Sequence, residues 1–197
     1  MPRAFAIVCV LGLSSLLAAC AGLRIVDSQV LAVANLPTGY ALQGASYRFE
    51  RLPSQVNNPE AGLAEQQAEQ ALAAVGLQRN DAGARLSVLV GFQGTQMYFD
   101  PWAGPYGGLS LGRGNHWGSG VGVGLGMRLP PTPMYRREVS LILRDLVSGQ
   151  VVYETRASHD GPWSDSVNIF ATLFKAALAN FPNPPAGPQR VNIEIPR

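Results

Sequence analysis

Apolar and polar residues alternate along several short segments of this chain, and a period of two predicts β-strands with one buried face. Pro53 ends the second of these segments, and residues 147–150 turn the chain between the fourth and the fifth, which predicts a hairpin. The last segment is expected to add an edge strand. The predicted strands cover residues 28–36, 45–52, 85–92, 139–144, 151–158 and 191–195.

A first helix is predicted between the second and third strands. Asn58 offers an N-cap, Pro59 suits the first helical position, and Gly76 is placed to take the left-handed conformation that closes the helix. Glu65 and Glu69 lie four residues apart on its polar face and are interpreted as solvated side chains. The apolar residues at helical spacing are Ala64, Ala68, Ala71, Leu72 and Val75.

A second helix is expected after Ser164 or Asp165, either of which can cap it, and Phe181-Pro182 ends it. Its apolar stripe must pack on the sheet. The stripe contains Val167, Phe170, Ala171, Phe174, Ala177, Leu178 and Phe181. The element order is therefore ββα, β, an insertion, ββα and a final β. Because strands and helices do not alternate as βαβα, this order favours an α+β fold, with two helices on one face of a largely antiparallel sheet.

The N-terminus carries a processing signal rather than part of the fold. Arg3 supplies a positive charge, and residues 4–17 form an apolar run that is short for a membrane-spanning helix. Leu17-Ala18-Ala19-Cys20 then reads as a bacterial lipobox. We expect cleavage between Ala19 and Cys20, which removes residues 1–19 as a signal peptide, and acylation of Cys20 with a fatty acid such as palmitate.

Removal of 19 residues from the 197 leaves 178, enough for one domain with its own hydrophobic core. We expect a lipidated tether over residues 20–27 and a single α+β domain over residues 28–197. Cys9 lies in the removed segment, so the domain has no thiol for a disulfide, a metal or a nucleophile. The formal net charge of +2 and the scattered arginines argue against a nucleic-acid partner.

The likeness of this signal to those of bacterial lipoproteins also implies a location. Such lipoproteins typically carry several acyl chains, which hold a protein at a membrane almost permanently. An aspartate after the acylated cysteine usually marks retention in the inner membrane, whereas this chain has Ala21 there. The resemblance therefore implies a protein that is anchored in the outer membrane through its N-terminal lipid and faces the periplasm.

Several motifs outside the signal resemble one family, the bacterial lipoproteins grouped as domain of unknown function 4136. These motifs are residues 74–77 (AVGL), 84–88 (ARLSV), 145–153 (DLVSGQVVY) and 180–182 (NFP). The resemblance covers most of the mature chain. It implies an envelope lipoprotein of this fold class, and it carries over no catalytic residue.

An insertion over about residues 93–128 is rich in glycine and aromatic residues. Its glycine spacings match neither G-x-G-x-x-G nor the P-loop pattern, so no nucleotide or other cofactor is expected. One interpretation is a loop that only connects two strands. The other is a recognition surface for an envelope protein or for peptidoglycan, since aromatic rings stack on sugars and on partner side chains. The candidate partner-binding residues are Trp102, Tyr106 and Trp117.

One short motif raises a catalytic alternative. Gly108-Leu109-Ser110-Leu111-Gly112 matches G-x-S-x-G, and Asp145 and His159 follow in the order of α/β-hydrolases. A nucleophile elbow needs a strand before the serine and a helix after it, whereas glycines surround Ser110. His116 and His159 lack metal-binding spacing, so no metal site is expected. We predict a non-catalytic envelope lipoprotein that binds a partner or supports the cell surface, with a small envelope hydrolase acting through Ser110 as the alternative.

Overall fold

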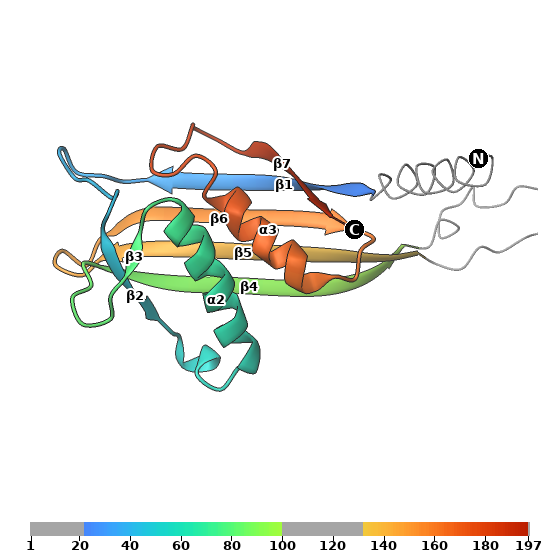
Figure 1. Cartoon of the computed structure of the whole chain (residues 1–197), viewed down its shortest axis with the longest axis horizontal. Helices are drawn as coiled ribbons and strands as arrows, with labels where there is room; N and C mark the ends of the chain where they lie inside the picture. Colours follow the sequence, from blue (N-terminus) through green and yellow to red (C-terminus); the bar gives the residue numbers. More distant parts are fainter. Residues whose placement is uncertain (1–21, 100–131, 197) are drawn as a thin grey trace, which may run out of the picture.

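The computed structural model describes residues 22–99 and 132–196, and in this part of the chain two α-helices, α2 and α3, pack on one face of a seven-stranded sheet (Figure 1). The strand order is β3-β2-β4-β5-β6-β1-β7. This arrangement confirms the predicted α+β fold class. The elements are β1 (Leu23–Ala34), β2 (Ser46–Glu50), a 3-10 turn (Pro53–Gln55), α2 (Pro59–Ala74), β3 (Gln78–Arg79), β4 (Leu86–Phe99), β5 (Thr132–Asp145), β6 (Val151–Gly161), α3 (Ser166–Ala177) and β7 (Gln189–Pro196).

Most of the sheet is antiparallel, as predicted. β4, β5, β6, β1 and β7 pair antiparallel in that order, whereas β2 runs parallel to both of its neighbours, β3 and β4. The parallel pairing follows from the connection, because α2 carries the chain back to the start of the sheet before β4 begins. Within residues 22–99 and 132–196, no helix is both long enough and apolar enough to cross a membrane.

β1 begins at Leu23, five residues before its predicted start. Residues 23–27, which were expected to belong to the tether, are therefore strand. The early start of β1 results from its pairing with β7, which begins at Leu23 opposite Pro196. β7 supplies backbone hydrogen-bond partners that the local sequence does not reveal. Side chains alternate strictly along β1, with Val26 and Val30 buried on the face beneath the helices and their neighbours exposed on the other face.

β4 and β5 are both longer than predicted: β4 runs to Phe99 and enters the segment assigned to the insertion, and β5 begins at Thr132, seven residues before its predicted start. They form one uninterrupted antiparallel ladder of fourteen residue pairs, from Leu86 opposite Asp145 to Phe99 opposite Thr132. The insertion boundary near residue 93 is therefore wrong by about seven residues. The backbone partner in β5 keeps Gln93–Phe99 extended even though this segment lacks a clean alternation of apolar and polar residues.

The ends of α2 follow the sequence signals closely. The Asn58 side chain accepts a hydrogen bond from the Glu60 backbone N–H at 3.0 Å, and Pro59 occupies the first helical position. At the other end Gly76 has a φ of +90° and the Leu77 N–H donates to the Leu72 carbonyl at 3.0 Å, which completes the predicted Schellman ending.

Glu65 and Glu69 of α2 are paired rather than simply solvated. Glu65 binds Arg51 through two hydrogen bonds of 2.6 Å, and Glu69 binds Arg79 at 2.9 Å. The two carboxylates therefore face separate arginines from the chain on either side of the helix, rather than each other.

α3 covers the centre of the sheet, but its buried stripe is rotated from the predicted one. Phe174 is fully buried as expected, whereas Val167 is 53% exposed and Phe170 is only partly buried. Ile169 and Leu173, which the prediction left out, are fully buried instead. The Thr155 hydroxyl on β6 donates to the last helical carbonyl, that of Ala177, at 2.8 Å. This bond fixes the C-terminal end of α3 on the sheet.

We expect Phe174→Ala to lower the free energy of unfolding by about 3–5 kcal/mol, because it empties a fully buried aromatic site between α3 and the sheet. Val167→Ala on the same helix is the matched control and should change it by less than about 0.5 kcal/mol. Denaturant unfolding followed by circular dichroism measures both. Equal losses in the two variants would contradict the observed packing of α3.

Candidate functional site

A groove of about 520 Å³ lies on the helix-covered face of the sheet. β4 and β5 continue past the helices here, so the strands form its floor and the first turns of α2 and α3 form its walls. We call this cavity the groove. Its lining residues are Asn58, Glu60, Leu63, Ala64, Gln67, Phe92, Gln93, Gly94, Thr95, Gln96, Tyr135, Arg136, Arg137, Ser166, Val167 and Phe170.

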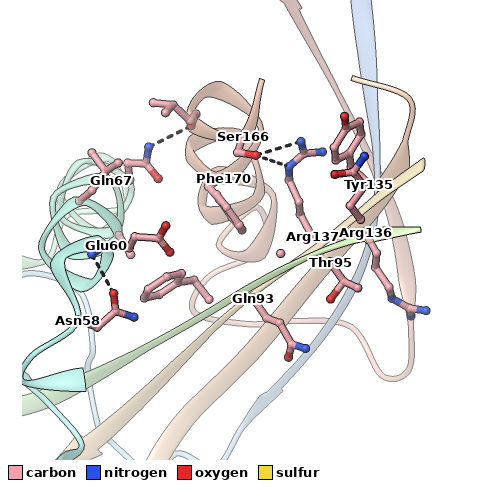
Figure 2. A pocket seen from close by; sticks show the side chains of 16 residues that line it. Asn58, Glu60, Gln67, Gln93, Thr95, Tyr135, Arg136, Arg137, Ser166 and Phe170 are labelled. Atoms are coloured by element: carbon pink, nitrogen blue, oxygen red, sulfur yellow. Dashed lines mark hydrogen bonds between the residues drawn. The ribbon is translucent and has the colours of Figure 1, made fainter. Parts of the chain in front are cut away.

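The groove is apolar at its bottom and polar at its rim. The rings of Phe92 and Phe170 meet edge to face with their centroids 6.3 Å apart. Figure 2 shows Phe170 projecting from α3 between the α2 residues Glu60 and Gln67 on one side and Arg137 on the other. The rim is mainly amide, hydroxyl and aromatic groups, with a carboxylate at one side and guanidinium groups at the other. This lining suits a polypeptide with mixed side chains.

Arg137 lies at the inner end of the groove and is only 2% exposed. Its guanidinium donates to the Ser166 hydroxyl at 3.1 Å and to the Trp163 carbonyl at 2.7 Å, and it stacks over the Tyr135 ring at 5.0 Å. Among the described residues it makes no ion pair, and burial lowers its pKa below the usual arginine value. A buried cation held by neutral acceptors ties β5 to the first turn of α3.

A second arginine fastens the same end of α3 to β1. Arg24 forms an ion pair with Asp165, the N-cap residue of α3, whose side chain also accepts from the Asn168 backbone N–H at 3.3 Å. The Arg24 guanidinium lies 5.6 Å from the Trp163 ring centroid, and His159 stacks on the same ring. The wall of the groove is therefore set by buried polar contacts rather than by apolar packing alone.

One side of β4 is open along the groove. β2 pairs with β4 only from Leu86 to Leu89, and the Gln55 side chain then donates to the Val90 carbonyl at 2.7 Å. From Gly91 to Phe99 no strand of the described chain pairs with that side of β4. We call Gly91–Phe99 the free edge. Its sequence, GFQGTQMYF, contains neither a charged residue nor a proline.

The free edge and the groove together form a site for an extended peptide. A strand added to β4 would take its backbone hydrogen bonds from the edge. Its inward side chains would enter the groove, because Phe92, Gly94 and Gln96 of β4 line it from the same face. At Gly94 a Cβ atom would approach only the Phe170 ring, at 3.6 Å, so this glycine leaves open room in the floor rather than relieving a close backbone contact.

The predicted site residues fall in a different part of the chain. Cys20 and Ala19 of the cleavage site lie outside the described residues, as do the candidate partner-binding residues Trp102, Tyr106 and Trp117. Ser110 of the hydrolase alternative and His116 lie outside them as well. Within residues 22–99 and 132–196, no group of three or more histidine, cysteine, aspartate or glutamate residues is placed to hold a metal ion.

Asp145 and His159 can be located, and they lie far apart. His159 is opposite Arg137 in the β5–β6 ladder, whereas Asp145 ends β5 eight residues further on, which is about 27 Å along a strand. His159 Nδ1 instead bonds the Asp27 carbonyl at 2.7 Å. These two residues therefore do not form the Asp–His pair that a hydrolase triad requires.

Asp145 organises the β5–β6 turn. Its carboxylate accepts the backbone N–H groups of Val147 at 3.0 Å and Ser148 at 2.7 Å, and it also accepts the Tyr40 hydroxyl. The hydrogen bond from Tyr40, with those from Ser148 and Val147, lowers the pKa of Asp145 to about 2. Burial and the Asp145 carboxylate raise the pKa of Tyr40 to about 12.

Sequence reasoning missed the residues that form the groove. Phe92 was recognised as a strand residue and Phe170 as a helix residue, but nothing in the sequence brings them together. Arg137 carried no signal because an arginine next to Arg136 reads as an exposed charge. The one available hint was the absence of charge and proline from residue 86 to residue 99, which is unusual for a strand that reaches the edge of a sheet.

Comparison with known proteins yields one family. The sequence model of the family described as Domain of unknown function (DUF4136) matches residues 38–183, which include both helices and strands β2 to β6. None of the curated proteins matches the chain.

Similar solved structures share little sequence with this chain. A PDZ domain protein from Parabacteroides distasonis ATCC 8503 has a TM-score of 0.50 and 11% identity, and the match covers 87% of this chain and 39% of that protein. The PelC dodecamer from Paraburkholderia phytofirmans has a TM-score of 0.45 and 16% identity, over 77% of this chain and 95% of that one. A minor lipoprotein from Acinetobacter baumannii has a TM-score of 0.34 and 14% identity, over 68% and 85% of the two chains.

We expect Asp145→Asn to reduce stability in a pH-dependent way. The folded-state pKa of Asp145 is depressed from 3.8 to about 2, so its ionised form stabilises the native turn fully above pH 4, and this contribution is lost as the pH falls toward 2. The deficit of the variant relative to the wild type should therefore be largest near neutral pH and should shrink between pH 4 and pH 2. Unfolding curves over this range test it, and a deficit that grew on acidification would contradict the assignment.

Proposed function

This chain belongs to the family described as domain of unknown function 4136, and we propose that it is a non-catalytic envelope lipoprotein that binds an extended segment of a partner protein. The proposal joins two elements of the chain. The lipobox at the N-terminus supplies an anchor, and the free edge of β4 beside the groove supplies a binding surface.

The anchor rests on the sequence. Cleavage between Ala19 and Cys20 leaves Cys20 as the acylated N-terminal residue, and Ala21 after it favours transfer to the outer membrane. The domain then stands on the periplasmic face, where its partner is another envelope protein. Trp102, Tyr106 and Trp117 follow directly on the free edge in the sequence, so they are candidates for additional contacts with the same partner.

The observation that carries the binding proposal is the unprotected character of the free edge. Proteins usually protect an edge strand with charge, proline or a covering segment, because open backbone groups recruit other strands. The opposite edge of this sheet follows that rule, since β7 carries Arg190, Glu194 and Pro196. Gly91–Phe99 has neither charge nor proline over nine residues, and no strand of the described residues pairs with its outer side. Such an edge is stable in a soluble envelope protein when a partner strand covers it.

The groove gives this pairing its selectivity. Backbone hydrogen bonds to β4 are independent of the partner's sequence, whereas every second side chain of an added strand would point into the groove. The edge-to-face pair of Phe92 and Phe170 favours an apolar side chain at the bottom, and the rim around Glu60 and Gln96 favours polar ones. The expected ligand is therefore an uncharged or mixed extended segment with at least one apolar anchor.

Photo-crosslinking in intact cells tests the binding surface. We expect a photoreactive amino acid at Thr95, on the free edge, to give a discrete crosslinked adduct, because the bound strand runs alongside it. The same amino acid at Asn192, an exposed position on the β7 edge, is the matched control and should give none.

Two variants of the groove test whether the Thr95 adduct comes from a partner bound in the groove or from a protein that is only nearby. Gly94→Ala fits beside Phe170 and should leave the Thr95 adduct unchanged, whereas Gly94→Leu fills the floor and should abolish it. Both proteins must retain the wild-type melting temperature. An adduct that persists in folded Gly94→Leu, or an equal adduct from Asn192, would refute the proposed surface.

The anchor is tested separately. Cys20→Ala should abolish incorporation of labelled palmitate and release the protein from the membrane fraction, because the mature chain has no second cysteine to accept a lipid. Labelling of growing cells followed by detergent partitioning measures both effects. Retained label in Cys20→Ala would show that the lipobox assignment is wrong.

A further inference from the structure

Cys20, the proposed lipid anchor, precedes the first residue of β1 by only three residues, so it is tied to one end of the sheet. Figure 1 shows the start of β1, the end of β7 and the paired ends of β4 and β5 at this same end. The registers agree: Leu23 is opposite Pro196, and extending the β1–β6 and β5–β6 pairings places Leu23 level with Thr132 and Phe99. We call this end of the sheet the tip.

The last rows of side chains at the tip are largely apolar. On the face away from the helices, Ile25 is level with Met134 and Met97, and Leu23, which is 60% exposed, lies one step nearer the end. On the other face Tyr98 is 68% exposed. Among the described residues of these rows on the face away from the helices, Glu194 opposite Ile25 is the only one with a charge. On the helix-covered face Arg24 is level with Tyr98, but its side chain is buried and forms an ion pair with Asp165.

A belt of charges begins one step behind these rows. Asp27 pairs with Arg190 at 3.4 Å, Arg136 with Asp160 at 3.8 Å, and next to them Glu138 with Arg156 at 3.2 Å. All three pairs lie on the exposed face of the sheet. The sheet is therefore amphipathic along its strands, with an apolar tip and a charged belt behind it.

Other exposed apolar residues of the sheet lack this arrangement. Leu31 and Val33 lie further along β1, but they are opposite Arg156 and Glu154, so charged side chains surround them. At the opposite end Val147 is 92% exposed, but apart from the partly exposed Leu146 next to it, the β5–β6 turn is polar and comes from a single connection. Within residues 22–99 and 132–196, only the tip gathers exposed apolar side chains from several strands at one end of the sheet.

The chain leaves little distance between the tip and Cys20. Leu23, the first residue of β1, is three residues after Cys20, and three fully extended residues span at most about 11 Å. A lipid on Cys20 therefore holds the tip within about one headgroup layer of the membrane, whatever the conformation of the intervening residues. Ala34 at the opposite end of β1, eleven residues further on, is about 36 Å from Leu23.

We propose that the tip of the sheet inserts into the membrane interface, with Leu23, Ile25, Met97 and Tyr98 in contact with lipid and the charged belt at the level of the headgroups. The assignment rests on the proposed acylation of Cys20 and adds an orientation to it: the strands stand up from the membrane instead of lying along it. Aromatic and apolar side chains at this depth partition favourably, and a tyrosine ring suits the boundary between water and lipid.

Site-directed spin labelling of the lipidated full-length product tests the orientation. The acylated mature chain has no free thiol, so Met97→Cys introduces a single labelling site. Val147→Cys at the opposite end is the matched control. In vesicles of phosphatidylethanolamine and phosphatidylglycerol, the Met97 label should collide preferentially with oxygen dissolved in lipid, and the Val147 label with a water-soluble nickel complex. Ile25→Cys provides a second tip position if Met97→Cys is poorly folded.

The outcomes separate this inference from the proposed function. If the protein floats with the vesicles but the Met97 and Ile25 labels are as accessible to nickel as the Val147 label, the anchor stands and the orientation is refuted. If the wild-type chain carries no lipid and does not float, the lipoprotein proposal itself fails. A preference for oxygen at both tip positions, absent at Val147, supports the insertion of the tip.

Discussion

The fourteen-pair ladder between β4 and β5 is the constraint on which the other features of this molecule depend. Its outer half, Gln93–Phe99 opposite Thr132–Glu138, has no β2 beside it, and α3 reaches over only the inner end of that half, at Gly94 and Arg137. That outer half creates the floor of the groove and the free edge, and it adds Met97 and Tyr98 to the tip. If the ladder ended at Gly91, just beyond the pairing with β2 and the hydrogen bond from Gln55 to the Val90 carbonyl, the groove floor and the free edge would be absent and the tip would consist of β1 and β7 alone.

Two buried arginines fix the position of α3 on the sheet. Arg24 and Arg137 reach from β1 and β5 to the first turn of α3, and each binds an acceptor in or just before that turn. Leaving a buried guanidinium without its acceptors costs far more than the net gain from forming the bonds. The start of α3 is therefore fixed more tightly than apolar contacts alone would fix it, and Phe170, one turn later, is presented to the groove at a defined position.

Local signals were enough to predict most elements from the sequence. Asn58-Pro59 and Gly76 bound α2 where they were expected to, and residues 147–150 turn β5 into β6, because such caps and turns depend on neighbours in sequence. The start of β1 and the outer half of β4 were not predictable, since their pairing partners lie far away in the chain. The groove escaped prediction for the same reason: its two phenylalanines are 78 positions apart, and the burial of Arg137 arises only once α3 covers it.

The proposed orientation restricts the partner as well as the protein. The free edge runs from Gly91 to Phe99 and ends at the tip, so a bound strand would extend along the same axis over about 27 Å. With the tip in the membrane interface, one end of that bound segment lies at the membrane surface and the other within about 30 Å of it. A partner that meets this condition is itself membrane-associated or has an extended segment next to its own membrane anchor. A freely diffusing periplasmic protein gains nothing from this geometry, whereas a protein held on the same surface has its effective concentration raised by confinement, which makes a short edge pairing sufficient for binding.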